Sequence, residues 1–143
     1  MPYRYHDDLS SADIGFEAFG RTAEELFTAA WEALLSVMID DSRALGRTVI
    51  REIELKEPEL ALLLFSFLDE ALFFKDSEGV LLTVKELSIT EDDRDFRLRA
   101  RLEGGPIDRC RNRLGTDVKA ITLHRFEFEE TEEGFRTQAV LDI

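Results

Sequence analysis

The segment RTQAVLDI, residues 136–143, ends the sequence in an alternating pattern. Leu141 and Ile143 share one phase of the alternation, and Asp142 shares the other phase with Val140. Such alternation is typical of a β-strand with one covered face. The carboxylate of Asp142 is placed where a strand is expected to fray and where packing does not require it. Asp142 is therefore the first candidate functional residue.

The segment DVKAITLHRFEFEE, residues 117–130, is predicted to be the neighbouring strand, because Gly134 between the two segments is typical of a hairpin turn. In VLLTVKELSIT, residues 80–90, the alternation changes phase at Lys85 and Glu86, which predicts a β-bulge. The other segments with strand patterns are YRYH at 3–6, a segment that begins near Asp13, RTVIREIEL at 47–55 and DRDFRLRARLE at 93–103.

Two segments have the periodicity of helices. In residues 21–40, Thr22 and Glu25 have the spacing of a capping box, in which each side chain binds an amide that the first helical turn leaves without a partner. Apolar residues follow at helical spacing and predict one buried stripe. The second helix is predicted to begin at Pro58, whose missing amide suits the first helical position, and to end at Gly79.

The second predicted helix is apolar on more than one side. One interpretation is that it has two buried faces, between a sheet and another helix. The other is that Leu63 or Phe65 belongs to an exposed patch that binds a partner protein. The sequence leaves both interpretations open.

The order of the elements predicts an α+β fold. Two strands, a helix, a strand, a helix and four strands favour a single domain over residues 1–143, with a largely antiparallel, mixed sheet and two helices packed on one face. Residues 104–116 are predicted to be irregular, because Gly104, Gly105 and Pro106 are expected to break regular pairing.

Composition limits the classes of function. The formal net charge of -13, from 31 acidic and 18 basic residues, argues against direct, stable nucleic-acid binding, because phosphate neutralisation supplies most non-specific affinity. A basic protein or a metal ion is a better partner. The lone cysteine, Cys110, fits a reducing compartment, and no apolar run approaches the ~20 residues of a membrane span. We therefore expect a cytoplasmic protein without a membrane partner.

Three polar residues take the strand phase opposite to the apolar residues beside them. Asp13, Lys119 and Asp142 can therefore meet on the sheet face away from the helices, or at its edge. Two carboxylates that meet repel each other, and a hard divalent cation removes that repulsion. Calcium accepts about six to eight oxygen ligands, and the free carboxylate of Ile143 is a further candidate donor.

The alternative is that these residues bind no metal: Asp13 and Asp142 are solvated, and Lys119 forms a surface salt bridge with one of them, an interaction worth ~0–1 kcal/mol. His124 is interpreted as a packed residue rather than a catalytic base. Two histidines and one cysteine are too few for a convincing zinc site. Further candidate ligands, less well placed by the pattern, are His6, Asp7, Asp8 and Asp41.

Two long segments of the chain resemble the archease family. SSADIGFEAFGRTAEELFTAAWEALLSVM, residues 10–38, resembles the family's opening, in which an H-T-A-D-I-G motif precedes a strand and a helix. Residues 117–143 resemble its closing pattern, V-K-A-[IV]-T followed by a hairpin and a terminal aspartate–isoleucine pair. The likeness covers nearly the whole chain. One departure is that Ser10 and Ser11 stand where the family usually has His-Thr.

The resemblance implies that Asp13, Lys119 and Asp142 are functional residues, and that the two aspartates take part in binding a divalent cation, with calcium as the expected ion. It also implies an activity. Archeases are accessory proteins of the RtcB-type, GTP-dependent RNA ligase, which joins tRNA halves and repairs broken RNA; they promote ligase guanylylation and repeated turnover. The resemblance thus leads us to expect a ligase activator without catalytic chemistry of its own.

The sequence leaves two other functions open. One is a chaperone or modulator of RNA-modifying enzymes such as methyltransferases, acting through the apolar second helix. The other is a stand-alone metal-dependent hydrolase, which is least favoured because few acid–base candidates accompany the two carboxylates.

Overall fold

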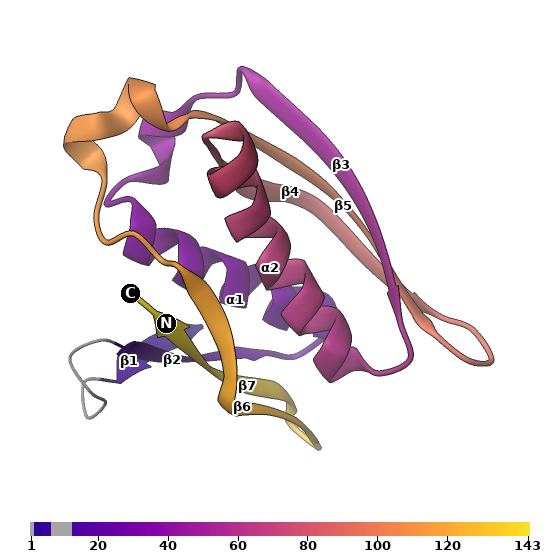
Figure 1. The fold of residues 1–143 in the computed structure, drawn as a ribbon. Coiled ribbons are helices and arrows are strands. Elements are labelled where there is room, and N and C mark those ends of the chain that lie inside the picture. The colour runs from indigo at the N-terminus through magenta and orange to yellow at the C-terminus, as the bar shows by residue number, and fades with distance from the viewer. Residues whose placement is uncertain (1, 7–12) are drawn as a thin grey trace.

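The computed structural model describes residues 2–6 and 13–143 (Figure 1). The helices pack against sheets whose strand pairs are all antiparallel, which confirms the predicted α+β class. The elements are β1 (Tyr3–His6), β2 (Asp13–Gly20), α1 (Ala23–Met38), η1 (Ser42–Leu45), β3 (Val49–Glu57), α2 (Leu60–Glu78), β4 (Val80–Glu91), β5 (Phe96–Pro106), η2 (Ile107–Arg113), β6 (Ala120–Thr131) and β7 (Gly134–Asp142), with η marking a short 3-10 helix.

The strands form two antiparallel sheets, one in the order β1-β2-β7-β6 and one in the order β3-β5-β4. Both helices lie between the sheets: α1 contacts β2 and β4, and α2 contacts β3, β4 and β6 (Figure 1). The expected antiparallel pairing is present, but the strands divide over two sheets where we had expected one. Alternation identifies a strand with one covered face and does not specify which strand it pairs with.

Helix α1 begins with the predicted capping box. The Oγ1 atom of Thr22 accepts a hydrogen bond from the Glu25 amide at 3.1 Å, and the Glu25 carboxylate accepts one from the Arg21 amide at 2.8 Å. The apolar stripe that follows is buried, and the indole of Trp31 donates to the Leu82 carbonyl at 2.7 Å. Helix α1 is thereby joined to strand β4 of the three-stranded sheet.

Replacing Thr22 with alanine is expected to lower the free energy of unfolding by about 1 kcal/mol, because the Glu25 amide loses its acceptor. Thr28→Ala is the matched control: it makes the same change inside α1, away from the cap, where alanine is the better helix former. Urea unfolding measures both. Equal losses for the two variants would argue that the cap contributes nothing.

Helix α2 has two buried faces, as one of the two interpretations expected. It begins two residues after Pro58 and ends at Gly79, whose φ of 66° is the left-handed conformation that a helix end often requires. Leu63 is fully buried, so the interpretation that it belongs to an exposed patch is wrong. Phe65 is half-buried and meets the ring of Phe126 edge-on at 5.7 Å. The exposed apolar residues of α2 are Leu62 and Phe73.

The predicted bulge in β4 is present as a register shift between Val84 and Glu86. Residues 104–106 are not irregular, since β5 continues through Pro106. Gly104 and Gly105 pair with residues of β4. An added Cβ would lie 2.0 Å from the carbonyl oxygen of Leu81 at Gly104 and 2.0 Å from that of Leu45 at Gly105, so neither position has room for a side chain. Glycine thus serves close packing here rather than a turn.

A second bulge, in β6, has no counterpart in the sequence analysis. The register with β7 shifts between Thr122 and Glu127, and Arg125 has a φ of 61°, which is uncommon for a residue other than glycine. The bulge turns His124 outward, so the interpretation of His124 as a packed residue is wrong. Leu123, in the same bulge, is 68% exposed.

Candidate functional site

Asp13 and Asp142 lie directly opposite each other. Strands β2 and β7 pair in antiparallel register along the whole of β2, and Asp13 and Asp142 are the pair at one end. Opposed residues of an antiparallel pair project to the same face with Cβ atoms about 4.5–5.5 Å apart. Two carboxylates separated by most of the chain are thereby neighbours, on the sheet face away from the helices.

Lys119 contacts the same end of the sheet, and the contact is made by its backbone. Its amide donates a hydrogen bond to the carbonyl oxygen of Asp142 at 2.8 Å, and its side chain is exposed. The residue opposite Asp142 on β6 is Ala120 rather than Lys119. Lys119 is therefore adjacent to Asp142 through the main chain, just before β6 begins, and the residue that shares the face of Asp142 on β6 is Ala120.

The donor atoms at this position suit a hard cation. The side chains of Asp13 and Asp142 are partly exposed, and Ile143 follows Asp142 directly. Across residues 2–6 and 13–143, no group of three or more His, Cys, Asp or Glu side chains is arranged to hold a metal ion. A cation held here would thus take two side-chain carboxylates and complete its shell with carbonyl or water oxygens, as calcium does.

Of the remaining candidate ligands, Asp41 has another role. It caps η1, where its side chain accepts hydrogen bonds from the amide and the guanidinium of Arg43. These contacts lower the pKa of Asp41. The other candidates lie outside the described residues or have side chains that do: His6, Asp7 and Asp8, together with the departure at Ser10 and Ser11.

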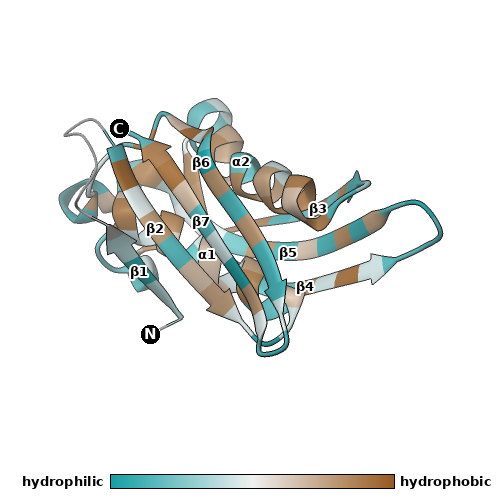
Figure 2. Cartoon of the chain, turned by 90° about the horizontal axis from the view of Figure 1, so that it is seen from below, coloured by the Kyte–Doolittle hydropathy of each residue, from teal (hydrophilic) through white to brown (hydrophobic). Residues whose placement is uncertain are grey.

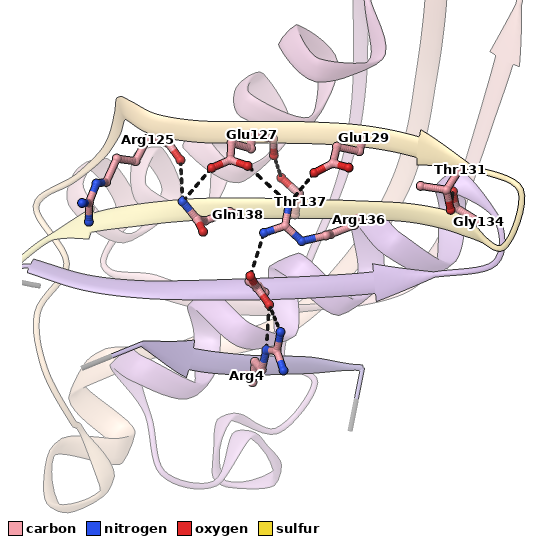
Figure 3. A network of polar contacts seen from close by, with 10 residues as sticks. Arg4, Arg125, Glu127, Glu129, Thr131, Gly134, Arg136, Thr137 and Gln138 are labelled. Carbon is pink, nitrogen blue, oxygen red and sulfur yellow. Dashed lines mark hydrogen bonds and ion pairs between the residues drawn. The ribbon is translucent and has the colours of Figure 1, made fainter. Parts of the chain in front are cut away.

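A ladder of charged residues crosses the same sheet face and was not predicted (Figure 3). Glu17 on β2 accepts hydrogen bonds from Arg4 on β1 at 2.7 Å and from Arg136 on β7 at 2.6 Å. Arg136 also donates to Glu129 on β6 at 2.8 Å and to Glu127 at 3.4 Å. The ladder thus links all four strands of this sheet.

Glu17 is the buried centre of this ladder, with only 5% of its surface exposed. Its hydrogen bond with Arg136 lowers its pKa to about 2, although burial opposes the shift, and the bond with Arg4 adds to the lowering. Arg136 in turn has a raised pKa, chiefly through Glu17. The carboxylate therefore stays charged at neutral pH because two guanidinium groups compensate for its loss of solvent.

The ladder has a consequence for the carboxylate pair. Glu17 lies on the same face of β2 as Asp13, and Arg136 on the same face of β7 as Asp142. A slip of one residue between β2 and β7 would move Asp13 opposite Leu141 and would break the bond between Glu17 and Arg136. The ladder therefore holds the register that makes Asp13 and Asp142 neighbours.

The sequence contains a partial signal for the ladder. Glu17 occupies the polar phase of its strand, as Asp13 does, and the strand ending at residue 142 carries Arg136 in the polar phase. Hydrophilic residues prevail along β6 towards the hairpin turn (Figure 2). Nothing local distinguishes a buried glutamate from a solvated one, because its burial depends on which strands lie on either side.

Among the described residues, no helix combines the length and the apolar character needed to cross a membrane. The interior faces of both sheets and the helices instead share one hydrophobic core, with Trp31, Phe27 and Phe67 among its largest members. The rings of Trp31 and Phe67 lie 4.7 Å apart.

Comparison with known proteins agrees with this architecture. A model of the Archease protein family (MTH1598/TM1083) matches residues 3–143. Protein archease of Methanosarcina barkeri is 36% identical over 142 residues, which are 99% of this chain and 95% of that protein. Protein archease of Thermococcus gammatolerans is 36% identical over 124 residues, or 87% of each chain.

Solved structures show the same fold. The solution structure of Methanobacterium thermoautotrophicum protein 1598 has a TM-score of 0.81 at 28% identity and covers 99% of both chains. The crystal structure of a Thermotoga maritima archease, described as a possible chaperone, has a TM-score of 0.61 at 23% identity, a likeness of fold alone. The family match over residues 3–143 and the relatives above 30% identity lead to one conclusion: this chain belongs to the archease family.

Proposed function

We propose that this protein is a non-catalytic activator of an RtcB-type, GTP-dependent RNA ligase, which promotes guanylylation of the ligase and its multiple turnover in tRNA splicing or RNA repair. Membership of the archease family supports the role. The single observation that carries the proposal is the register pairing of Asp13 with Asp142. A cytoplasmic location and the absence of stable nucleic-acid binding, consistent with the net charge of -13, belong to the same proposal.

In this proposal Asp13, Asp142 and Ile143 supply oxygen ligands to a divalent cation, with calcium as the expected ion. The cation supplies a fixed double positive charge that neutralises the opposed carboxylates. Asp13 and Asp142 are oriented by the antiparallel pairing of β2 and β7. Lys119 is bonded to Asp142 through its backbone amide and has an exposed side chain, which is proposed to contact the ligase.

Activation requires contacts that are stronger in one state of the ligase than in another. A protein that bound the resting and the guanylylation-competent ligase equally well would shift nothing. The carboxylate end of the four-stranded sheet is proposed to bind the competent arrangement of ligase and nucleotide more tightly. The protein itself then needs no acid, base or nucleophile.

Removal of the metal tests this function. The protein is stripped with a chelator, the chelator is dialysed away, and the protein is added to a ligase with GTP and excess RNA ends. The expected result is several products per ligase molecule with untreated protein, about one with stripped protein, and recovery when calcium is added back. Ligase without this protein, with and without calcium, is the control.

The two parts of the proposal fail separately in this experiment. Full stimulation by stripped protein would remove the metal from the mechanism and leave the activator role intact. Absence of stimulation by untreated protein would remove the ligase role. Ligase-bound GMP, measured in the same samples, shows whether guanylylation is the step that responds.

A second candidate is a chaperone or modulator of RNA-modifying enzymes such as methyltransferases. The observation that favours it is the exposure of Leu62 and Phe73 on α2, at 42% and 57%. The Thermotoga maritima relative is described as a possible chaperone. Phe73→Ser should then weaken protection of a methyltransferase from aggregation and leave ligase stimulation unchanged, because Phe73 lies on α2, whereas Asp13 and Asp142 lie on β2 and β7.

A further inference from the structure

A cavity of about 310 Å³ lies where the C-terminal ends of α1 and α2 meet the segment between η2 and β6. The segment is fixed by main-chain bonds, since the amides of Gly115 and Thr116 donate to the carbonyls of Met38 and Val37, each at 2.8 Å. The volume is in the range of sites that enclose a small ligand or one large side chain. Its apolar walls are formed by Met38, Leu81, Ile107 and Leu114.

One side of the cavity is polar and contains a buried lysine. The side chain of Lys75 is only 9% exposed, and its ammonium group donates to Asp76 at 2.6 Å and to Asp117 at 2.8 Å. Burial opposes the charge of Lys75, but the bonds to Asp117 and Asp76 outweigh it and raise the pKa of the lysine. Lys75 therefore stays protonated and holds both carboxylates in place.

The two carboxylates keep acceptor capacity. Each uses its Oδ1 atom for Lys75, and neither Oδ2 atom accepts a hydrogen bond from any residue that the structure describes. The side chains of Asp76 and Asp117 are 61% and 69% exposed, so these oxygens are accessible from solvent. One ammonium and two carboxylates sum to a charge of -1, which disfavours an anionic occupant and favours a cationic one.

The shape and charge of the cavity specify the occupant further. Apolar walls suit an aliphatic stem. The two carboxylates at the rim, each with an accessible Oδ2 atom, suit a head group that donates several hydrogen bonds. The arginine side chain has both parts, with a planar guanidinium that can bind two acceptors at once. Lysine is a compact and strongly hydrated point charge and suits the site less well. The neighbouring Arg111 is paired with Asp108 at 2.6 Å, outside the cavity.

We propose that this cavity is an anchor site for an arginine side chain presented by a partner protein. Asp117 lies two residues before Lys119, whose amide bonds to Asp142. A partner anchored at Asp76 and Asp117 would therefore lie beside the paired carboxylates of Asp13 and Asp142. The inference goes beyond the proposed function, because it specifies how a partner is held and not which partner it is.

The test is a titration of the isotope-labelled protein with N-acetyl-L-arginine amide, followed by amide and methyl NMR. The expected result is saturable shifts of the amides of residues 115–117 and of the methyl groups of Leu81 and Ile107. N-acetyl-L-lysine amide should bind more weakly, and N-acetyl-L-glutamate amide should cause no shifts there. Asp117→Asn should weaken arginine binding about tenfold, as the loss of one charged hydrogen bond predicts.

Asp108→Asn is the matched control, since it removes the same charge from an exposed, arginine-paired aspartate next to the cavity. Equal weakening by both variants, shifts spread over the acidic β6–β7 hairpin, or glutamate binding at residues 115–117 would each overturn the inference. Asp76→Asn replaces Asp117→Asn if the latter does not fold. The titration contains no ligase, so its outcome is independent of the ligase proposal.

Discussion

Asp142→Asn is expected to abolish stimulation of multiple-turnover RNA ligation. The change keeps the size of the side chain but leaves one carboxylate where register pairing places two. Loss of a direct ligand should lower calcium affinity by more than the about 10–100-fold that loss of an outer partner costs. The measurements are calcium binding by calorimetry and products per ligase molecule in excess RNA. Asp13→Asn should have the same effect in both.

Two variants make this prediction specific. Asp93→Asn removes the same charge from an exposed residue in the β4–β5 turn, which lies at the far end of the molecule from residue 143, and should change neither measurement (Figure 1). Lys119→Ala should lower stimulation and keep calcium binding, because the bond from residue 119 to Asp142 is made by the backbone. Undiminished stimulation by Asp142→Asn, with the fold intact by circular dichroism, would falsify the role of the carboxylate pair.

Glu17→Gln is expected to lower the free energy of unfolding by about 2–3 kcal/mol at pH 7. The variant keeps the size of the side chain but leaves Arg4 and Arg136 without their shared buried carboxylate. Arg136 retains Glu127 and Glu129, which limits the loss. Urea unfolding measures the change. Glu129→Gln is the control, because its side chain is 53% exposed and its bond to Arg136 should be worth less than about 1 kcal/mol.

The difference in stability between the wild-type protein and Glu17→Gln should depend on pH. The pKa of Glu17 is lowered from its ordinary value of 4.5 to about 2 in the folded state, so folding favours the ionised form. Its contribution, on the order of 3 kcal/mol, is present above pH 4.5 and is lost as the pH falls towards 2. Wild type and Glu17→Gln should therefore converge in stability across this window. A constant difference from pH 7 to pH 2 would contradict a charged Glu17.

Local sequence patterns determined the elements of this protein. The capping box at Thr22 and Glu25, the stop at Gly79 and the bulge near Glu86 depend on residues close together in the chain, and all three are present. The sequence also predicted that Asp13 and Asp142 lie on the polar face of their strands, because alternation with period two assigns each residue of a strand to a face.

Only the tertiary structure decided how these elements combine. The division into two sheets, the β6 bulge that exposes His124, and the burial of Glu17 between Arg4 and Arg136 each depend on strands far apart in the chain. The approach of Asp117 to Lys75, 42 residues away, is of the same kind. Strand partners and register are set by the sum of many weak long-range contacts, which no single segment contains. The sequence thus assigned Asp13 and Asp142 to a face, and the pairing of β2 with β7 made them neighbours.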